Sequence, residues 1–145
     1  MSSLPNHPFG LTITDANILA TMRSLQGWEA RYRQLILWGK QLPVMEERLK
    51  SDQAVVAGCE SQVWLVSEQD EQDGWLFFAD SDARIVRGLI AVVLAALNAK
   101  TGEQIAAFDM DAYFSDLGLL DHLSPSRGNG LKAIVEKIRT EINVY

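Results

Sequence analysis

Cys59 is the only cysteine in this chain of 145 residues, and its setting raises the question of thiol chemistry. It follows Gly58 in the stretch A-V-V-A-G-C-E-S-Q-V-W-L, between two short apolar runs typical of strands, at residues 54–57 and 63–66. Gly58 gives the turn conformational freedom and places no side chain beside the sulfur. A lone thiol at such a turn is either a small buried hydrophobe or a presented nucleophile. Spacing alone favours the buried hydrophobe.

A single cysteine limits the chemistry that this chain can do by itself. It cannot close an intramolecular disulfide, and it cannot bind an iron–sulfur cluster or a structural zinc without other ligands. His7 and His122 are the only histidines, and neither lies at a ligand spacing from Cys59, so we expect no metal site within the monomer. Whether the fold brings a histidine to Cys59 is left open by the sequence. The neighbouring Glu60 would oppose thiolate formation, so no self-contained activated nucleophile is evident.

Length, charge and hydropathy limit the class of protein and its partners. With 145 residues, 48% of them hydrophobic, the chain is expected to form one domain with a single core. The formal net charge of −6 argues against nucleic acid or an anionic membrane as the main partner. The longest apolar run, residues 85–97, is too short to span a bilayer and is interrupted by Arg87. No signal peptide is visible, which together with the free thiol favours a cytoplasmic location.

Two short patterns resemble ligand-binding motifs but lack the flanking elements that those motifs need. Residues 128–133 match the dinucleotide pattern G-x-G-x-x-A, yet Ser-Pro-Ser-Arg precedes them where a strand is required. Residues 69–80 loosely resemble a calcium loop, but the first position is the neutral Gln69 and the flanks read as strands. Arg127 is a cation at a predicted helix start, an unfavourable place without an anionic partner. We therefore expect Arg127 to contact another group, in this chain or in a partner.

The elements that must position Cys59 predict an α+β fold, a small antiparallel sheet with helices around it. Residues 1–13 are expected to be a loosely ordered N-terminal arm, followed by a single domain at 14–145. Asp73-Gly74 predicts a hairpin, which would place Cys59 at the opposite end of the middle strand from the hairpin tip. The three residues at 80–82 offer N-caps for a central helix. Capping residues and apolar periodicity predict helices at about 15–26, 28–38, 83–98, 102–108, 110–117 and 127–143, with a short charged turn at 46–49.

Five ordered blocks resemble the SufE/CsdE family of sulfur acceptor proteins. They are W-E-A-R-Y-R-Q-L-I at 28–36, G-K-Q-L-P at 39–43, G-C-E-S-Q-V-W at 58–64, D-S-D-A-R-I-V-R-G-L-I-A-V at 80–92 and L-S-P-S-R-G-N-G-L at 123–131. Together they extend over most of the chain after the arm. The opening H-P-F-G at 7–10 resembles the CsdE branch, whereas D-S-D and L-S-P-S-R suit the SufE branch equally, so the branch is left open.

The resemblance implies a three-stranded antiparallel sheet flanked by helices, similar to the U-type iron–sulfur scaffold. It also implies that Cys59 accepts persulfide sulfur from a pyridoxal-phosphate cysteine desulfurase of the SufS/CsdA type and stimulates that enzyme. The sulfur would pass to an iron–sulfur scaffold or another acceptor for iron–sulfur cluster assembly. On this reading the chain is an accessory protein rather than an enzyme, and it needs no cofactor because the pyridoxal phosphate belongs to the partner.

The same resemblance assigns supporting or docking roles to six residues in the matching blocks: Gly58 as a hinge, with Glu60, Gln62, Asp80, Asp82 and Arg127. An alternative of a different class is a regulatory binding module, which activates a desulfurase or docks a client such as a tRNA-modifying enzyme without carrying sulfur. A thiol-dependent hydrolase or transferase is a third reading, supported only by the thiol. The sequence leaves open whether the protein forms a homodimer and whether Cys59 is sheltered at rest.

Overall fold

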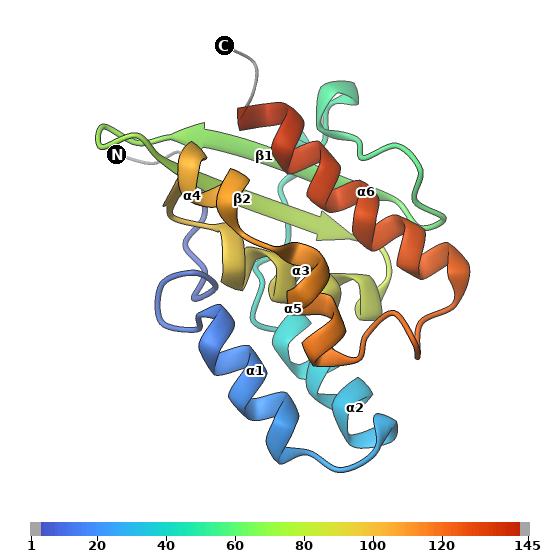
Figure 1. The fold of residues 1–145 in the computed structure, drawn as a ribbon. Coiled ribbons are helices and arrows are strands. Elements are labelled where there is room, and N and C mark those ends of the chain that lie inside the picture. The colour runs from blue at the N-terminus through green and yellow to red at the C-terminus, as the bar shows by residue number, and fades with distance from the viewer. Residues whose placement is uncertain (1–3, 143–145) are drawn as a thin grey trace.

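The computed structural model describes residues 4–142 and contains a three-stranded antiparallel sheet with helices around it (Figure 1). The strands are β1 (Val63–Gln69), β2 (Gly74–Ser81) and β3 (Lys100–Thr101), in the order β1-β2-β3. The helices of this described part are α1 (Asp15–Ser24), α2 (Trp28–Gly39), α3 (Arg84–Leu97), α4 (Gly102–Ala107), α5 (Met110–Leu117) and α6 (Pro125–Ile142). Two 3-10 turns, η1 (Glu47–Leu49) and η2 (Asp52–Ala54), precede β1. The α+β class predicted from the sequence is confirmed.

The predicted hairpin joins β1 and β2, whose register runs from Val63↔Ser81 to Gln69↔Trp75. Asp73 adopts a positive φ of 64° in the connecting turn. The carboxylate of Asp70 accepts the backbone N–H of Gly74 at 2.8 Å, so it stabilises the turn from within. The residues that resembled a calcium loop therefore form a hairpin whose turn is held by its own aspartate side chain.

The third strand is not the one predicted. Residues 54–57 were expected to form a strand, but Ala54 ends η2, and Val55 makes only an isolated bridge with Trp64. Only Val55 and Val56 reach the start of β1, and Gly58, with a φ of +87°, lies in the turn that follows them. The third strand is instead β3, which pairs with the start of β2. As a result β1 is an edge strand, and Cys59 lies just before it, at the opposite end from the hairpin.

Helix α3 is the centre of the molecule, because it contacts β2 on one side and α1, α2 and α6 on others (Figure 1). Its residues are buried almost all round, as the sequence indicated. Gly88 permits close packing on α2, since a Cβ added there would lie 2.2 Å from the carbonyl oxygen of Leu35. The predicted side-chain N-cap is wrong: the N-cap of α3 is Ala83, which makes no side-chain capping bond. The side chains of Asp80 and Asp82 instead contact other segments of the chain.

Several predicted helix boundaries are confirmed by their caps. Thr14 forms a capping box with Asn17 at the start of α1, and Thr101 forms another with Gln104 at the start of α4. The side chain of Asp109 accepts the N–H of Ala112 and so caps α5. Helix α6 begins at Pro125, two residues before the predicted start, so Arg127 lies within its first turn.

The N-terminal arm is packed against the sheet over residues 7–13, in contrast to the loosely ordered segment expected for residues 1–13. Phe9 is fully buried, and the Nε2–H of His7 donates to the carbonyl oxygen of Phe77 at 2.8 Å. β3 pairs only with Gly74 and Trp75 of β2, so the next part of that edge needs other partners. Asn98 links the N-terminal arm to this edge of β2, because its side chain accepts the Phe77 N–H at 2.7 Å and donates to the Phe9 carbonyl at 2.9 Å. Residues 1–3 of the arm lie outside the described residues.

No helix within residues 4–142 has the length and apolar character needed to cross a membrane.

Candidate functional site

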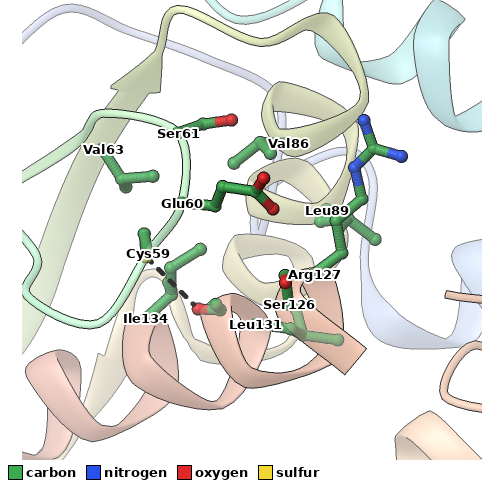
Figure 2. Close-up of a pocket in the computed structure, with 11 residues that line it drawn as sticks. Cys59, Glu60, Ser61, Val63, Val86, Leu89, Ser126, Arg127, Leu131 and Ile134 are labelled. Atoms are coloured by element: carbon green, nitrogen blue, oxygen red, sulfur yellow. Dashed lines mark hydrogen bonds between the residues drawn. The ribbon is translucent and has the colours of Figure 1, made fainter. Parts of the chain in front are cut away.

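Cys59 lies in the loop between η2 and β1, where its side chain meets helix α6 (Figure 2). The Sγ atom of Cys59 lies 3.7 Å from the carbonyl oxygen of Gly130 and donates a weak hydrogen bond to it. A Cβ added at Gly130 would lie 3.6 Å from the sulfur, so the two segments are in van der Waals contact. Gly58 adopts its left-handed φ immediately before the cysteine and directs the thiol onto α6.

A pocket of about 170 Å³ opens beside the thiol, between the Cys59 loop, α3 and α6 (Figure 2). Its apolar wall consists of Val63, Val86, Leu89, Leu131 and Ile134. Its polar lining consists of Glu60 and Ser61 from the loop and Ser126 and Arg127 from the first turn of α6. The pocket therefore has an apolar wall beside the sulfur and charged groups from both of the segments that meet there.

The surroundings of the sulfur favour the neutral thiol. Cys59 is half-buried and packs against the hydrophobic core. Burial raises the pKa of the Cys59 thiol above its ordinary value. Its polar partner, the Gly130 carbonyl, accepts a hydrogen bond from S–H but offers nothing to a thiolate. At rest the thiol is thus partly sheltered and weakly nucleophilic.

The Cys59 loop is anchored at both ends and little held between them. At one end the N–H of Val56 donates to the Val63 carbonyl at 2.9 Å. At the other end the N–H of Gln62 donates to the carboxylate of Asp82 at 3.1 Å, and the Asp82 N–H donates back to the Gln62 carbonyl at 3.3 Å. Between these anchors, residues 57–61 form a turn and bends outside any helix or strand. This part of the loop is therefore less constrained than its anchors.

The structure places Asp80 away from the Cys59 pocket, in a buried network. Its carboxylate accepts the N–H of Met45 at 2.8 Å and forms an ion pair with Arg87. The Arg87 guanidinium also donates to the carbonyl oxygens of Gly39, at 3.3 Å, and Leu42. Asp80 is only 3% exposed, and it joins β2 and α3 to the segment that follows α2. Of the two predicted supporting aspartates, only Asp82 contacts the Cys59 loop.

Neither histidine is brought to Cys59. The ring of His122 stacks on Trp28 with 4.6 Å between centroids and 12° between planes, and its Nδ1–H donates to the Gly118 carbonyl at 2.9 Å. His7 lies in the N-terminal arm, against Phe77. No Cys–His pair is formed, and the residues that the structure describes contain no group of three His, Cys, Asp or Glu side chains that could hold a metal ion.

Sequence reasoning missed Gly130 as a site residue. Residues 128–130 were considered as part of a dinucleotide pattern, and the structure places them inside α6, with no strand before them. Gly130 instead makes the close contact with the Cys59 sulfur. The available signal was a glycine within an otherwise helical apolar pattern, which often marks a close approach of another segment. The sequence alone does not show which segment approaches.

The fold and the site define a small α+β protein that carries one half-buried thiol on a loop above a pocket. Residues 16–142 match the model of the SufE family, described as the Fe-S metabolism associated domain. The chain therefore belongs to the SufE family, and its resemblance to the SufE/CsdE proteins is confirmed.

Relatives support this assignment, and one solved structure shares the fold. The chain is 46% identical over 132 residues to the sulfur acceptor protein CsdE of Escherichia coli, covering 91% of this chain and 90% of the relative. It is 46% identical to an uncharacterized SufE-like protein of Rhizobium etli, covering 83% of each chain. The solution structure of a hypothetical protein from Thermus thermophilus superposes with a TM-score of 0.71 at 16% identity, covering 88% of this chain and 92% of that one. This last similarity concerns the fold alone.

Proposed function

We propose that this protein is a sulfur carrier, which takes persulfide sulfur from a pyridoxal-phosphate cysteine desulfurase onto Cys59. The observation that carries the proposal is the position of the only cysteine, on a loop anchored at both ends, with its sulfur against Gly130 beside a pocket. Membership of the SufE family and the printed name of the Escherichia coli relative, a sulfur acceptor, support it. The carrier stimulates the desulfurase by removing its persulfide, and it delivers sulfur for iron–sulfur cluster assembly in the cytoplasm.

The transfer is a thiol–persulfide exchange that needs no cofactor on this chain. The Cys59 thiolate attacks the outer sulfur of the persulfide on the desulfurase cysteine. A new S–S bond forms on Cys59, the S–S bond on the desulfurase breaks, and the desulfurase cysteine leaves as a thiolate. The same exchange in the next step moves the outer sulfur from Cys59 to a downstream acceptor. The pyridoxal phosphate acts earlier, in the partner enzyme.

We propose that the loop opens for this exchange, because the thiol is half-buried and rests against α6. We propose that Gly58 is the hinge. Glycine adopts its left-handed φ at little cost, and it can also adopt most other backbone conformations when the loop opens. Residues 57–61 move, while the contact between Gln62 and Asp82 holds the outer end of the loop. Return of the loaded sulfur to the pocket would protect a water-labile persulfide.

The remaining supporting residues have different roles in this proposal. Glu60 lines the pocket beside a thiol whose pKa is raised by burial, so activation of the thiol falls to groups of the partner in the complex. Asp80 acts indirectly, since its network with Arg87 fixes the corner between β2 and α3. Arg127 faces the pocket from α6, where it can contact a docked partner. We propose that the whole chain acts as one SufE-like unit.

Intact-protein mass spectrometry tests the proposal directly. The protein is incubated with a cysteine desulfurase and cysteine, and Cys59→Ser, which keeps a side chain of similar size, is run as the matched control. We expect a mass gain of one sulfur atom that reductant reverses and that the variant lacks. Cys59→Ser should also lose the stimulation of cysteine turnover. No mass gain with an unchanged stimulation by Cys59→Ser would contradict the carrier role and favour the regulatory binding module.

A further inference from the structure

The immediate surroundings of the Cys59 sulfur suit the empty thiol better than the sulfur-loaded cysteine. The groups nearest the thiol are the Gly130 carbonyl, which can only accept hydrogen bonds, and the apolar wall from β1, α3 and α6. These surroundings accommodate a neutral S–H and oppose a negative charge. A persulfide is a stronger acid than a thiol, because the neighbouring sulfur stabilises its anion. Loading therefore places on Cys59 a terminal sulfur that tends to be anionic at neutral pH, and this sulfur needs a partner that the thiol does not.

Among the described residues that line this pocket, Arg127 is the only cation. The loop contributes one acid, Glu60, while β1 and α3 contribute only apolar side chains. Figure 2 shows the Glu60 side chain extending across the pocket from the loop, and the Arg127 side chain rising from the first turn of α6 with its guanidinium, in this view, on the far side of Glu60 from Cys59. The structure records no ion pair between them within 4 Å, and no ion pair of Arg127 with any other described residue. The guanidinium is thus available to an anion in the pocket.

Reach also favours Arg127. A terminal sulfur extends about 2 Å beyond Sγ, the length of one S–S bond. The pocket of about 170 Å³ is continuous from Cys59 to the first turn of α6, so it has room for that atom. The terminal sulfur can therefore turn away from the Gly130 carbonyl and toward the polar end of the pocket, where the Arg127 side chain, turned outward in Figure 2, can swing inward to meet it.

We propose that Arg127 is the charge partner of the sulfur-loaded cysteine, binding the terminal perthiolate sulfur of Cys59 within the pocket. The inference rests on the proposed carrier function and adds a specific role for one residue. Arg127 distinguishes the loaded state from the empty state, because only the loaded state has an anion for it to bind. It positions the loaded sulfur and takes part in no bond that forms or breaks.

The test loads Cys59 without a desulfurase, so its outcome is independent of whether the protein accepts sulfur from one. Inorganic polysulfide supplies the sulfur: the Cys59 thiolate attacks it, an S–S bond forms on Sγ, one S–S bond of the polysulfide breaks, and a shorter polysulfide dianion leaves. Mass spectrometry selects protein carrying one extra sulfur. The apparent pKa values of the thiol and of the persulfide then follow from the pH dependence of their alkylation by iodoacetamide.

We expect Arg127→Gln to raise the apparent pKa of the persulfide by about one unit, the lower end of the effect of a nearby opposite charge. Arg127→Glu should raise it further, and Arg127→Lys should stay close to the wild type. The pKa of the empty thiol should change less in every case. Lys132→Gln is the matched control, since it removes one exposed cation from the same helix outside the pocket lining.

Two results would overturn the assignment. One is an unchanged persulfide pKa in Arg127→Gln and Arg127→Glu. The other is an equal shift in Lys132→Gln, which would indicate a general effect of net charge rather than a contact. Arg127 is exposed and its side chain makes no hydrogen bond to any other residue in the range 4–142, so these variants should fold like the wild type, which circular dichroism checks.

Discussion

The sulfur of Cys59 rests on the backbone of Gly130, with 3.7 Å between Sγ and the carbonyl oxygen. The contact joins the loop before β1 to helix α6, and it leaves room at residue 130 for little more than one Cβ, which would lie 3.6 Å from the sulfur. This contact determines whether the thiol is sheltered, so the size of residue 130 should control the exposure of Cys59.

We expect Gly130→Val to release Cys59 from its seat. A single Cβ at this position would lie 3.6 Å from Sγ, an ordinary van der Waals distance, so Gly130→Ala should leave the loop nearly unchanged. The extra methyl groups of valine overpack the site, at a cost of about 1–3 kcal/mol. If about 1.4 kcal/mol of that cost falls on the seated loop, alkylation of Cys59 by iodoacetamide at fixed pH becomes about tenfold faster.

Gly128→Val provides a control for substitution within the same helix, because its nearest neighbour is Leu120 rather than the thiol. Equal alkylation rates in Gly130→Val and the wild type would show that the Gly130 contact does not shelter Cys59.

Asp82→Ala should loosen the outer anchor of the Cys59 loop with little effect on global stability. Asp82 is exposed, and its carboxylate holds the N–H of Gln62 through a bond at 3.1 Å. Loss of an exposed hydrogen bond costs about 0.5–1.5 kcal/mol, which acts on the loop rather than on the core. Alkylation of Cys59 should become a few times faster while the thermal midpoint stays within about 2 °C. A large fall in the midpoint with an unchanged alkylation rate would contradict this role.

Asp80→Ala should have the opposite profile, although the two aspartates are only two residues apart. The substitution leaves the Arg87 charge without its buried partner and the Met45 N–H without its acceptor. Breaking a buried pair from one side costs about 3–5 kcal/mol, which urea unfolding would measure. Asp80→Asn retains an acceptor and should lose less. A change below about 1 kcal/mol in Asp80→Ala would show that the network contributes little to stability.

These two aspartates illustrate what could be predicted from the sequence. Their place near the junction of a strand and a helix was recognised, although Asp80 lies within β2, because strand alternation and helix periodicity are local signals. Their partners were not, because Met45 and Gln62 are brought to them by the fold. Both had been predicted as helix caps, whereas the N-cap of α3 is Ala83, which makes no side-chain capping bond.

The same distinction holds elsewhere in the chain. The capping boxes of α1 and α4 and the hairpin at Asp73 were predicted, since each depends on residues a few positions apart. The sequence did not predict that β3, rather than residues 54–57, is the third strand, because pairing with β2 depends on distant segments. The site shows the same limit: Cys59 stood out by its type, but the contact with Gly130 joins residues 71 positions apart.

His7 should make the stability of the protein depend on pH. Burial lowers the pKa of His7, which donates through Nε2–H to the Phe77 carbonyl and accepts the Phe9 N–H through Nδ1. The unfolded chain therefore binds a proton at His7 more readily than the folded chain does. The contribution of neutral His7 is complete above its ordinary pKa of about 6.5, and it is lost as the pH falls from there through the lower folded value.

Urea unfolding of the wild type and of His7→Gln at pH 7.5 and pH 5.5 measures this effect. Glutamine retains a donor for the Phe77 carbonyl and does not titrate, so the variant should lose less stability than the wild type between the two pH values. His122→Gln is the control for the other histidine, which stacks on Trp28 at the surface. The prediction is wrong if His7→Gln and the wild type show the same loss on acidification.

Gly58→Ala should distinguish the effect of the hinge at Gly58 from the effect of the contact between the Cys59 loop and α6. A Cβ at residue 58 would lie 3.7 Å from the Cβ of Ala133, so there is room for it, and the cost arises from the φ of +87°. A left-handed conformation costs an L-residue about 1–2 kcal/mol, and this strain is relieved when the loop leaves its seat. Alkylation of Cys59 should therefore become faster, by about tenfold for 1.4 kcal/mol.

Gly27→Ala is a suitable control, because it carries the same kind of strain, with a φ of +82° and open space around it, at the start of α2. It should lower global stability and leave the thiol reactivity unchanged. Slower alkylation in Gly58→Ala would instead indicate that opening passes through conformations that only glycine adopts, and the loop would then be held by its hinge rather than by its contact with α6.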